Sequence, residues 1–169
     1  NWSVVVPLRA LRTEFVITGH DAAGQPVAGE AQSLTISYTG GNPLPTDRVV
    51  INEWMASNTT TLADPADGDF DDWFEIYNPN LFPVDLSGYG LTDEPTNPTR
   101  FICPPRTVLG PRGYMLVWAD AEPRQNAGGR DLHISFKLPR AGGTITLFNR
   151  TGQIIDQIAF RAQDGDVSQ

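Results

Sequence analysis

The sequence predicts an all-β protein whose main part is a sandwich of two sheets. Glycine and proline are frequent, with 16 and 14 copies among 169 residues, and both destabilise helix interiors. Short segments in which apolar and polar residues alternate recur along the chain, and this period of two is typical of strands. Several short strands separated by turns are therefore expected, with little room for helices.

Charge and cysteine content exclude several classes of site. The formal net charge is −8, lysine occurs once, at Lys137, and the eleven arginines are scattered. Because a nucleic-acid footprint needs clustered basic residues, nucleic acid is not expected as a partner. No apolar run approaches the ~20 residues that span a bilayer, so membrane insertion is not expected. Cys103 is alone, which excludes a disulfide within the chain, and we expect it to be a small buried apolar residue.

Residues 1–39 are expected to be the C-terminal fragment of a preceding β module. Strands are predicted at residues 4–8, 14–18 and 33–38, with a turn at residues 21–24. Three strands leave a sheet face uncovered, and an unpaired edge recruits other strands. The segment should therefore pack on the second unit or pair with a neighbouring chain. Strand exchange between identical chains, giving a homodimer through residues 1–39, is the least costly way to pair.

A linker and a second domain follow. Residues 40–47 are rich in glycine and proline, which defeat regular structure, so the domain boundary is placed there. Roughly eight strand patterns then fill residues 48–169, a density typical of an immunoglobulin-like sandwich. They are predicted at residues 49–54, 72–78, 84–91 (as two short pieces around Ser87-Gly88), 100–103, 114–118, 132–138, 144–148 and 153–160.

Alternation within these strands predicts which side chains form the core. One inter-sheet core is expected to contain Phe74, Ile76, Leu116, Trp118, Phe136, Leu138, Ile145 and Leu147. In residues 132–138 the same alternation directs His133, Ser135 and Lys137 outward. His20 and His133 lie in different units and no Gly-x-Ser-x-Gly elbow occurs, so hydrolytic catalysis is not expected.

An acidic loop between the first two strands of the second domain is the one candidate metal site. It carries five aspartates, Asp64, Asp67, Asp69, Asp71 and Asp72. Clustered oxygen ligands suit Ca²⁺, but counting from Asp64 places Gly68 fifth, where an EF-hand needs glycine sixth. Two interpretations stay open: a Ca²⁺ site of another geometry, or a solvated loop in which aspartate and glycine form turns.

The strand that follows this loop offers a candidate binding face. Trp73, Glu75 and Tyr77 share one face of the strand, opposite Phe74 and Ile76. Aromatic rings beside a carboxylate form a platform for a ligand where such a face is exposed to solvent.

Several longer motifs occur in a defined order in residues 48–169. They include Ile51-Asn-Glu53, Asp72-Trp-Phe-Glu-Ile-Tyr-Asn-Pro79, Val84-Asp-Leu-Ser-Gly-Tyr89, Gly113-Tyr-Met-Leu-Val-Trp-Ala119 and Gly142-Gly-Thr-Ile-Thr-Leu147. In order and spacing these motifs resemble the lamin tail domain in the form found in bacterial modular proteins. Residues 1–39 resemble the closing strands of a bacterial immunoglobulin-like or fibronectin-type module.

The resemblance implies a non-catalytic module rather than an enzyme. It implies an interaction or structural role in a secreted or surface-attached bacterial multidomain protein, with a protein partner or a cell-surface component as the ligand. The implied location is extracellular or at the cell surface. The alternative that stays open is a carbohydrate-binding accessory module of an extracellular hydrolase. Apart from Ca²⁺ in the acidic loop, no cofactor is expected.

Overall fold

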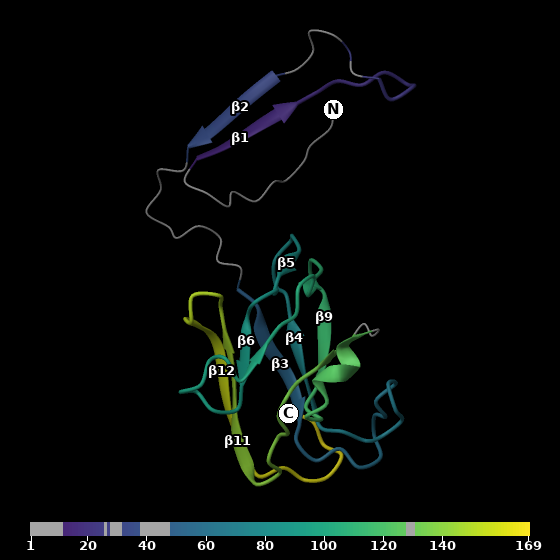
Figure 1. Ribbon diagram of the computed structural model, residues 1–169, viewed down its shortest axis with the longest axis vertical. Helices are drawn as coiled ribbons and strands as arrows, with labels where there is room; N and C mark the ends of the chain where they lie inside the picture. The colour runs from purple at the N-terminus through teal and green to yellow at the C-terminus, as the bar shows by residue number, and fades with distance from the viewer. Residues whose placement is uncertain (1–11, 26, 28–31, 38–47, 128–130) are drawn as a thin grey trace. The chain divides into compact units, whose positions relative to one another are not determined.

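The chain divides into two compact units, residues 1–46 and 47–169, in a computed structural model (Figure 1). The structure describes residues 12–25, 27, 32–37, 48–127 and 131–169. The strand predicted at residues 4–8 and the predicted linker lie outside the described residues. In the described parts of the chain, no helix has the length and apolar character needed to cross a membrane.

The first unit contains an antiparallel pair of strands. Strand β1 (Arg12–Ile17) pairs with β2 (Gln32–Ser37) along their full length. Between them, the Asp21 carboxylate accepts hydrogen bonds from the backbone amides of Ala23 and Gln25, and Gly24 has a φ of 78°. This is the turn chemistry predicted for residues 21–24.

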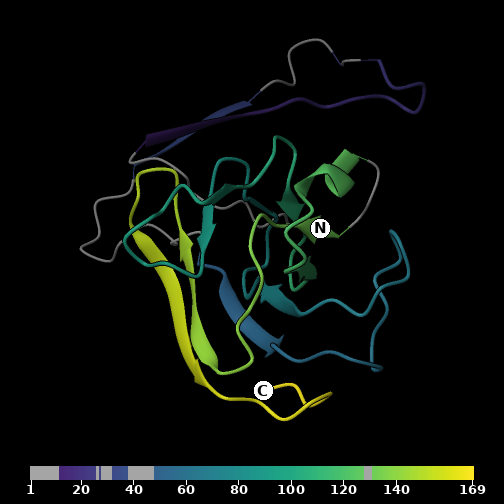
Figure 2. The same ribbon diagram turned by 60° about the horizontal axis from the view of Figure 1, so that its bottom comes forward.

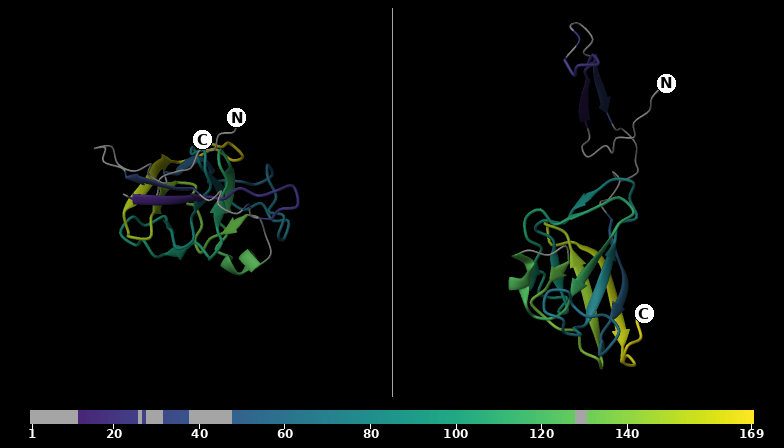
Figure 3. Two further views of the ribbon diagram at one scale, coloured as in Figure 1. Left: turned by 90° about the horizontal axis from the view of Figure 1, so that it is seen from above. Right: turned by 90° about the vertical axis from the view of Figure 1, so that its right-hand side faces the viewer.

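The second unit is a β-sandwich, which confirms the all-β prediction. Its first sheet has the order β10-β9-β4-β3, with β3 Val50–Met55, β4 Trp73–Tyr77, β9 Tyr114–Trp118 and β10 Leu132–His133. Its second sheet has the order β12-β11-β6-β7, with β6 Gly90–Thr92, β7 Phe101–Ile102, β11 Gly142–Phe148 and β12 Ile154–Arg161. A ribbon of β5 (Val84–Asp85) and β8 (Val108–Leu109) and the 3₁₀ helix η1 (Pro123–Ala127) complete it. Figure 2 shows β11 and β12 as a long pair in one layer, and Figure 3 shows the sandwich from two further sides.

The inter-sheet core is made by the alternating apolar residues of both sheets. Six of the eight residues predicted for it are buried there, namely Phe74, Ile76, Phe136, Leu138, Ile145 and Leu147. Cys103 is also buried in this core, as predicted, and burial raises the pKa of its thiol to about 12. A thiol that stays protonated behaves as a small apolar residue.

The prediction of one core was wrong for Leu116 and Trp118. On β9, Met115 and Val117 face the inter-sheet core, whereas Leu116 and Trp118 face the other way. Trp118 is fully buried in a second cluster, which it forms with Met55 and Trp73 and to which Leu116 adds. The error has a simple cause. Every residue of β9 from Met115 to Trp118 is apolar, so hydrophobicity cannot identify the inner face.

The strand predicted at residues 132–138 forms a ladder only at β10. Strand β10 runs parallel to β9, and its two residues pair with Val117 and Trp118. Because β9 ends at Trp118, no partner strand continues beyond that point among the described residues, where an isolated bridge joins Asp120 to Lys137. The predicted alternation still holds, since Leu132, Ile134, Phe136 and Leu138 are all buried in the inter-sheet core.

The outer edge of β3 is covered by the C-terminal residues. The backbones of Trp54 and Gln169 exchange two hydrogen bonds of 3.0 Å. The side chain of Gln163 accepts the amide of Ala56, and Asp156 accepts the amide of Ile51 at 2.8 Å. These contacts satisfy amides that an open sheet edge would leave unpaired.

Candidate functional site

Within the second unit, one end of the outer face of the first sheet is buried and carries a histidine between two aspartates. His133 pairs with Trp118 across β10 and β9, so it lies on the outer side of the sheet as predicted, yet only 2% of it is exposed. Its Nδ1 lies 2.6 Å from Oδ2 of Asp120 and 3.3 Å from Oδ2 of Asp64. Asn126 of η1 holds the backbone of His133 through bonds of 2.9 Å and 2.7 Å.

A single N–H cannot serve both carboxylates. Nδ1 faces two carboxylate oxygens, which only accept, so it carries its hydrogen and donates it to the nearer one, on Asp120. Oδ1 of Asp64 accepts the amide of Ala66 at 2.8 Å, but its Oδ2 is buried and accepts no hydrogen bond. The 3.3 Å separation from Nδ1 is an ion-pair distance without hydrogen-bond geometry. Burial raises the pKa of Asp64, because desolvation outweighs the Ala66 amide and the His133 charge.

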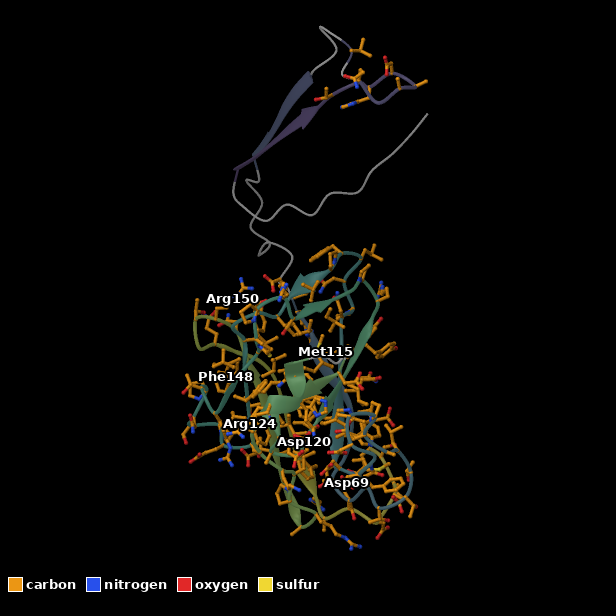
Figure 4. All side chains as sticks on the ribbon, turned by 45° about the vertical axis from the view of Figure 1, so that its right-hand side comes forward. Asp69, Met115, Asp120, Arg124, Phe148 and Arg150 are labelled. Carbon is orange, nitrogen blue, oxygen red and sulfur yellow. The ribbon has the colours of Figure 1, made fainter. Side chains whose placement is uncertain are left out.

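The five aspartates of the acidic loop do not act alike. One carboxylate oxygen each from Asp64, Asp67 and Asp71 lies within 4.8 Å of the others, a spacing that could hold a metal ion. Asp69 and Asp72 are not in this group. Asp72 accepts the amide of Asn58 at 2.9 Å, and Asp69 is exposed (Figure 4). Burial raises the pKa of Asp71 and of Asp72.

Turn formation is also visible in the loop. The side chains of Asp64 and Asp67 each accept the amide two residues onward, from Ala66 and Asp69. The backbone amide of Asp69 and a hydrogen bond from the Gln125 side chain lower the pKa of Asp67. Turn formation uses Oδ1 of Asp64 and leaves its Oδ2 without a donor, so the turn contacts and the Ca²⁺ interpretation do not exclude each other.

The histidine–aspartate pair does not have the access that catalysis needs. A general base must come within hydrogen-bond reach of its substrate. His133, Asp120 and Asp64 are each at most 3% exposed. This cluster could not be predicted from the sequence, because Asp64, Asp120 and His133 come from three separate segments and only tertiary contacts bring them together.

The opposite end of the same outer face is exposed. Trp73, Glu75 and Tyr77 share this face of β4, as predicted, but Trp73 is only 8% exposed while Glu75 and Tyr77 are half-buried. Tyr77 stacks on Tyr114 of β9 with ring centroids 4.6 Å apart and planes at 25°. Tyr114 is 58% exposed, and Arg112 donates to the Tyr77 hydroxyl at 3.4 Å. Sequence reasoning missed Tyr114, although alternation along β9 places it on the face of Leu116 and Trp118.

A groove borders this exposed end. It has a volume of about 470 Å³ and is lined by Val108, Leu109, Gly110, Tyr114, Met115, Leu116 and Asp131. A second hollow of about 220 Å³ continues it and shares Val108, Met115 and Asp131. In the described part of the chain, β10 pairs only with the last two residues of β9, so the ladder does not extend alongside Tyr114.

Comparison with known families gives one match. The family model described as Lamin Tail Domain matches residues 42–162. In a search of curated proteins, none matches this chain. The matched span contains both sheets, the acidic loop and the Tyr77–Tyr114 pair, whereas residues 163–169, which cover the edge of β3, lie beyond it.

Proposed function

Because this chain belongs to the lamin tail domain family, we propose that it is a non-catalytic interaction module that binds a protein partner at the exposed end of its first sheet. The observation that carries the proposal is the stacked pair of Tyr77 and Tyr114. We call the surface formed by Tyr77, Arg112, Tyr114, Leu116 and Val108 the tyrosine face.

The residue types of the tyrosine face suit protein recognition. Tyrosine and arginine are enriched among the residues that dominate interface energies, and tyrosine offers a large contact area with few rotatable bonds. Stacking on Tyr77 and the bond from Arg112 already restrict the rings before a partner arrives. Such pre-ordering reduces the entropy lost on binding.

We propose an extended segment of the partner, carrying basic and apolar side chains, as the occupant of the groove. Strand β10 pairs with β9 only at Val117 and Trp118, so the earlier residues of β9 form a strand edge on this side. A strand added to such an edge by the partner is a recurring mode of peptide recognition. Asp131 in the groove and the net charge of −8 favour a basic partner. Exposed Val108, at 52%, supplies apolar contact.

The test uses short random peptides displayed for selection against the full chain. We expect the enriched peptides to be basic and to bind Tyr114→Ala about tenfold more weakly, which is the loss expected for one interface anchor. Ile102→Ala is the matched control, since Ile102 is 45% exposed on the other sheet and should leave binding unchanged. Peptides that bind the Tyr114→Ala variant as tightly as the unmodified chain would refute the proposal. Glycan-array binding that depends on Tyr114 would favour the carbohydrate alternative instead.

We also propose, from the resemblance alone, that the parent protein is an extracellular or surface-attached bacterial multidomain protein. Pairing of residues 1–39 between identical chains belongs to the same proposal. Sedimentation of the full chain and of a form lacking residues 1–45 tests the pairing, because the shorter form retains its own core and should be monomeric. A monomeric full chain would contradict it.

A further inference from the structure

Asp64 is an unusual residue in the second unit because its carboxylate is fully buried and only half satisfied. Its exposure is 0%, and Oδ2 has no hydrogen-bond donor. An ionised carboxylate buried without a partner is strongly disfavoured, so a proton or a cation must compensate it. The neighbouring His133 supplies only part of that compensation, because its Nδ1 hydrogen is directed to Asp120 and Oδ2 of Asp64 lies 3.3 Å from Nδ1 without a hydrogen bond.

The residues around Asp64 favour a cation. Asp67 and Asp71 each place a carboxylate oxygen within 4.8 Å of the Asp64 carboxylate. Calcium–oxygen bonds of 2.3–2.6 Å allow two ligands of one ion to lie at most about 5 Å apart, so the three carboxylates fit one Ca²⁺. Lys137 places its Nζ 3.6 Å from Oδ1 of Asp71, but its side chain is 66% exposed and it carries one charge against three.

We propose that Asp64, Asp67 and Asp71 bind one Ca²⁺ ion that compensates the buried Asp64 carboxylate and joins the acidic loop to the first sheet. The proposal does not depend on the protein-binding function of the tyrosine face. Of the five aspartates predicted as metal ligands from the sequence, the proposal retains three. Backbone carbonyls and water would complete the six to eight oxygen ligands that Ca²⁺ takes.

The available donors favour Ca²⁺ over zinc. A zinc site of Asp64, Asp120 and His133 would need Nδ1 as a ligand, but Nδ1 and Oδ2 of Asp120 are 2.6 Å apart. Two ligands of one tetrahedral zinc ion, each at about 2.0–2.1 Å, lie farther apart than that. The all-oxygen group on the loop side of Asp64 has no such conflict. Asp67 has further lone pairs beside its bonds to Asp69 and Gln125.

The experiment titrates CaCl₂ into the EDTA-treated full chain by isothermal titration calorimetry. We expect one binding event per chain, weakened about tenfold or more by Asp71→Asn and by Asp67→Asn, because each removes a charged ligand. Asp69→Asn is the matched control. Asp69 lies in the same loop with the same charge but outside the group, so its replacement should change the affinity by no more than about twofold. Asp64→Asn should abolish the binding event, and thermal melts without Ca²⁺ verify that each variant folds.

A second measurement locates the ion. The chain contains two histidines, so imidazole NMR signals are simple to assign. Ca²⁺ at Asp64 should shift the ring signals of His133, which contacts Asp64, and leave those of His20 unchanged. No binding heat at millimolar Ca²⁺, or equal weakening by Asp69→Asn, would overturn the proposal in favour of turn formation or diffuse attraction. Binding of Zn²⁺ but not Ca²⁺, lost with His133→Gln, would overturn the choice of ion.

Discussion

The two ends of the outer face of the first sheet differ although the same strands build them. At one end, Trp73 and Trp118 pair across β4 and β9 and are 8% and 0% exposed. At the other end, Tyr77 and Tyr114 form the equivalent cross-strand pair, and Tyr114 is 58% exposed. Both are pairs of aromatic residues, four positions apart along each strand. Their environments are opposite because different segments lie over them.

The covering segments explain the difference. Asp131 accepts a hydrogen bond of 3.3 Å from the indole of Trp118, and Gln125 of η1 binds Asp67 of the acidic loop at 2.8 Å. Asp64 of the same loop reaches His133 beside Trp118. A cover made of polar segments buries carboxylates against the sheet. The negative charge of each buried carboxylate must then be compensated by a proton, a cation or a hydrogen-bond donor. At the other end no such polar cover lies over Tyr114 in the described part of the chain, and its ring stays exposed to solvent.

The largest expected effect is a difference in the loss of stability when an aromatic residue is removed from each end of the outer face. Trp118→Ala should lower the free energy of unfolding by about 3–5 kcal/mol, because it leaves a large cavity in a fully buried cluster. Tyr114→Ala should lower it by only about 0.5 kcal/mol, as expected for an exposed side chain. Urea unfolding of both variants measures the contrast. Equal losses would mean that the two ends are covered alike.

The next effect tests the buried histidine. His133→Leu should cost about 3 kcal/mol at neutral pH, because it leaves the buried carboxylate of Asp120 without its donor. Asp120→Leu combined with His133→Leu should recover part of this loss, since neither polar partner is then left alone. A double-mutant cycle in urea measures the coupling, and strict additivity would show that the pair does not interact.

A smaller effect concerns Asp64 in EDTA, without Ca²⁺. The pKa of Asp64 is raised in the folded state, mainly by desolvation, so the folded protein holds this proton more tightly than the unfolded chain. Its contribution to stability is present at low pH and is lost as the pH rises through the folded pKa. Asp64→Asn should therefore gain about 1 kcal/mol relative to wild type at neutral pH and little at acid pH. Unfolding curves at several pH values measure the difference, and a pH-independent offset would contradict it.

The smallest effect involves the C-terminal residues that hold the start of the acidic loop. The side chain and amide of Thr59, with those of Thr60, bond to the carboxylate of Asp166 and hold its pKa well below the usual range. Because the folded pKa is lowered, the stabilisation is present above the unfolded pKa of about 4 and is lost as the pH falls. Asp166→Ala should lower the melting temperature at neutral pH and lower it less in acid. Iodide quenching of tryptophan fluorescence should rise in the variant if the cover over Trp73 loosens.

Local sequence determined which residues share a face. In residues 132–138 the alternation correctly identified Leu132, Ile134, Phe136 and Leu138 as core, and in β4 it separated Phe74 from Trp73. These predictions succeed because the side-chain period of a strand is a property of the local backbone. Residue type alone identified the turn at residues 21–24, from its Asp and Gly, and the buried character of Cys103, from its being a lone cysteine.

Only the tertiary structure decided which outer faces are covered. Nothing near His133 in the sequence shows that Asp64 lies against it, and the wholly apolar run of β9 hides the choice of its inner face. The separation of Asp64, Asp67 and Asp71 from Asp69 and Asp72 likewise depends on how the loop folds onto the sheet. The burial of a side chain depends on contacts with segments that are distant in the sequence. Alternation therefore specifies the two faces of a strand, while the segments that pack over each face decide whether its residues form a core, a buried polar cluster or a binding surface.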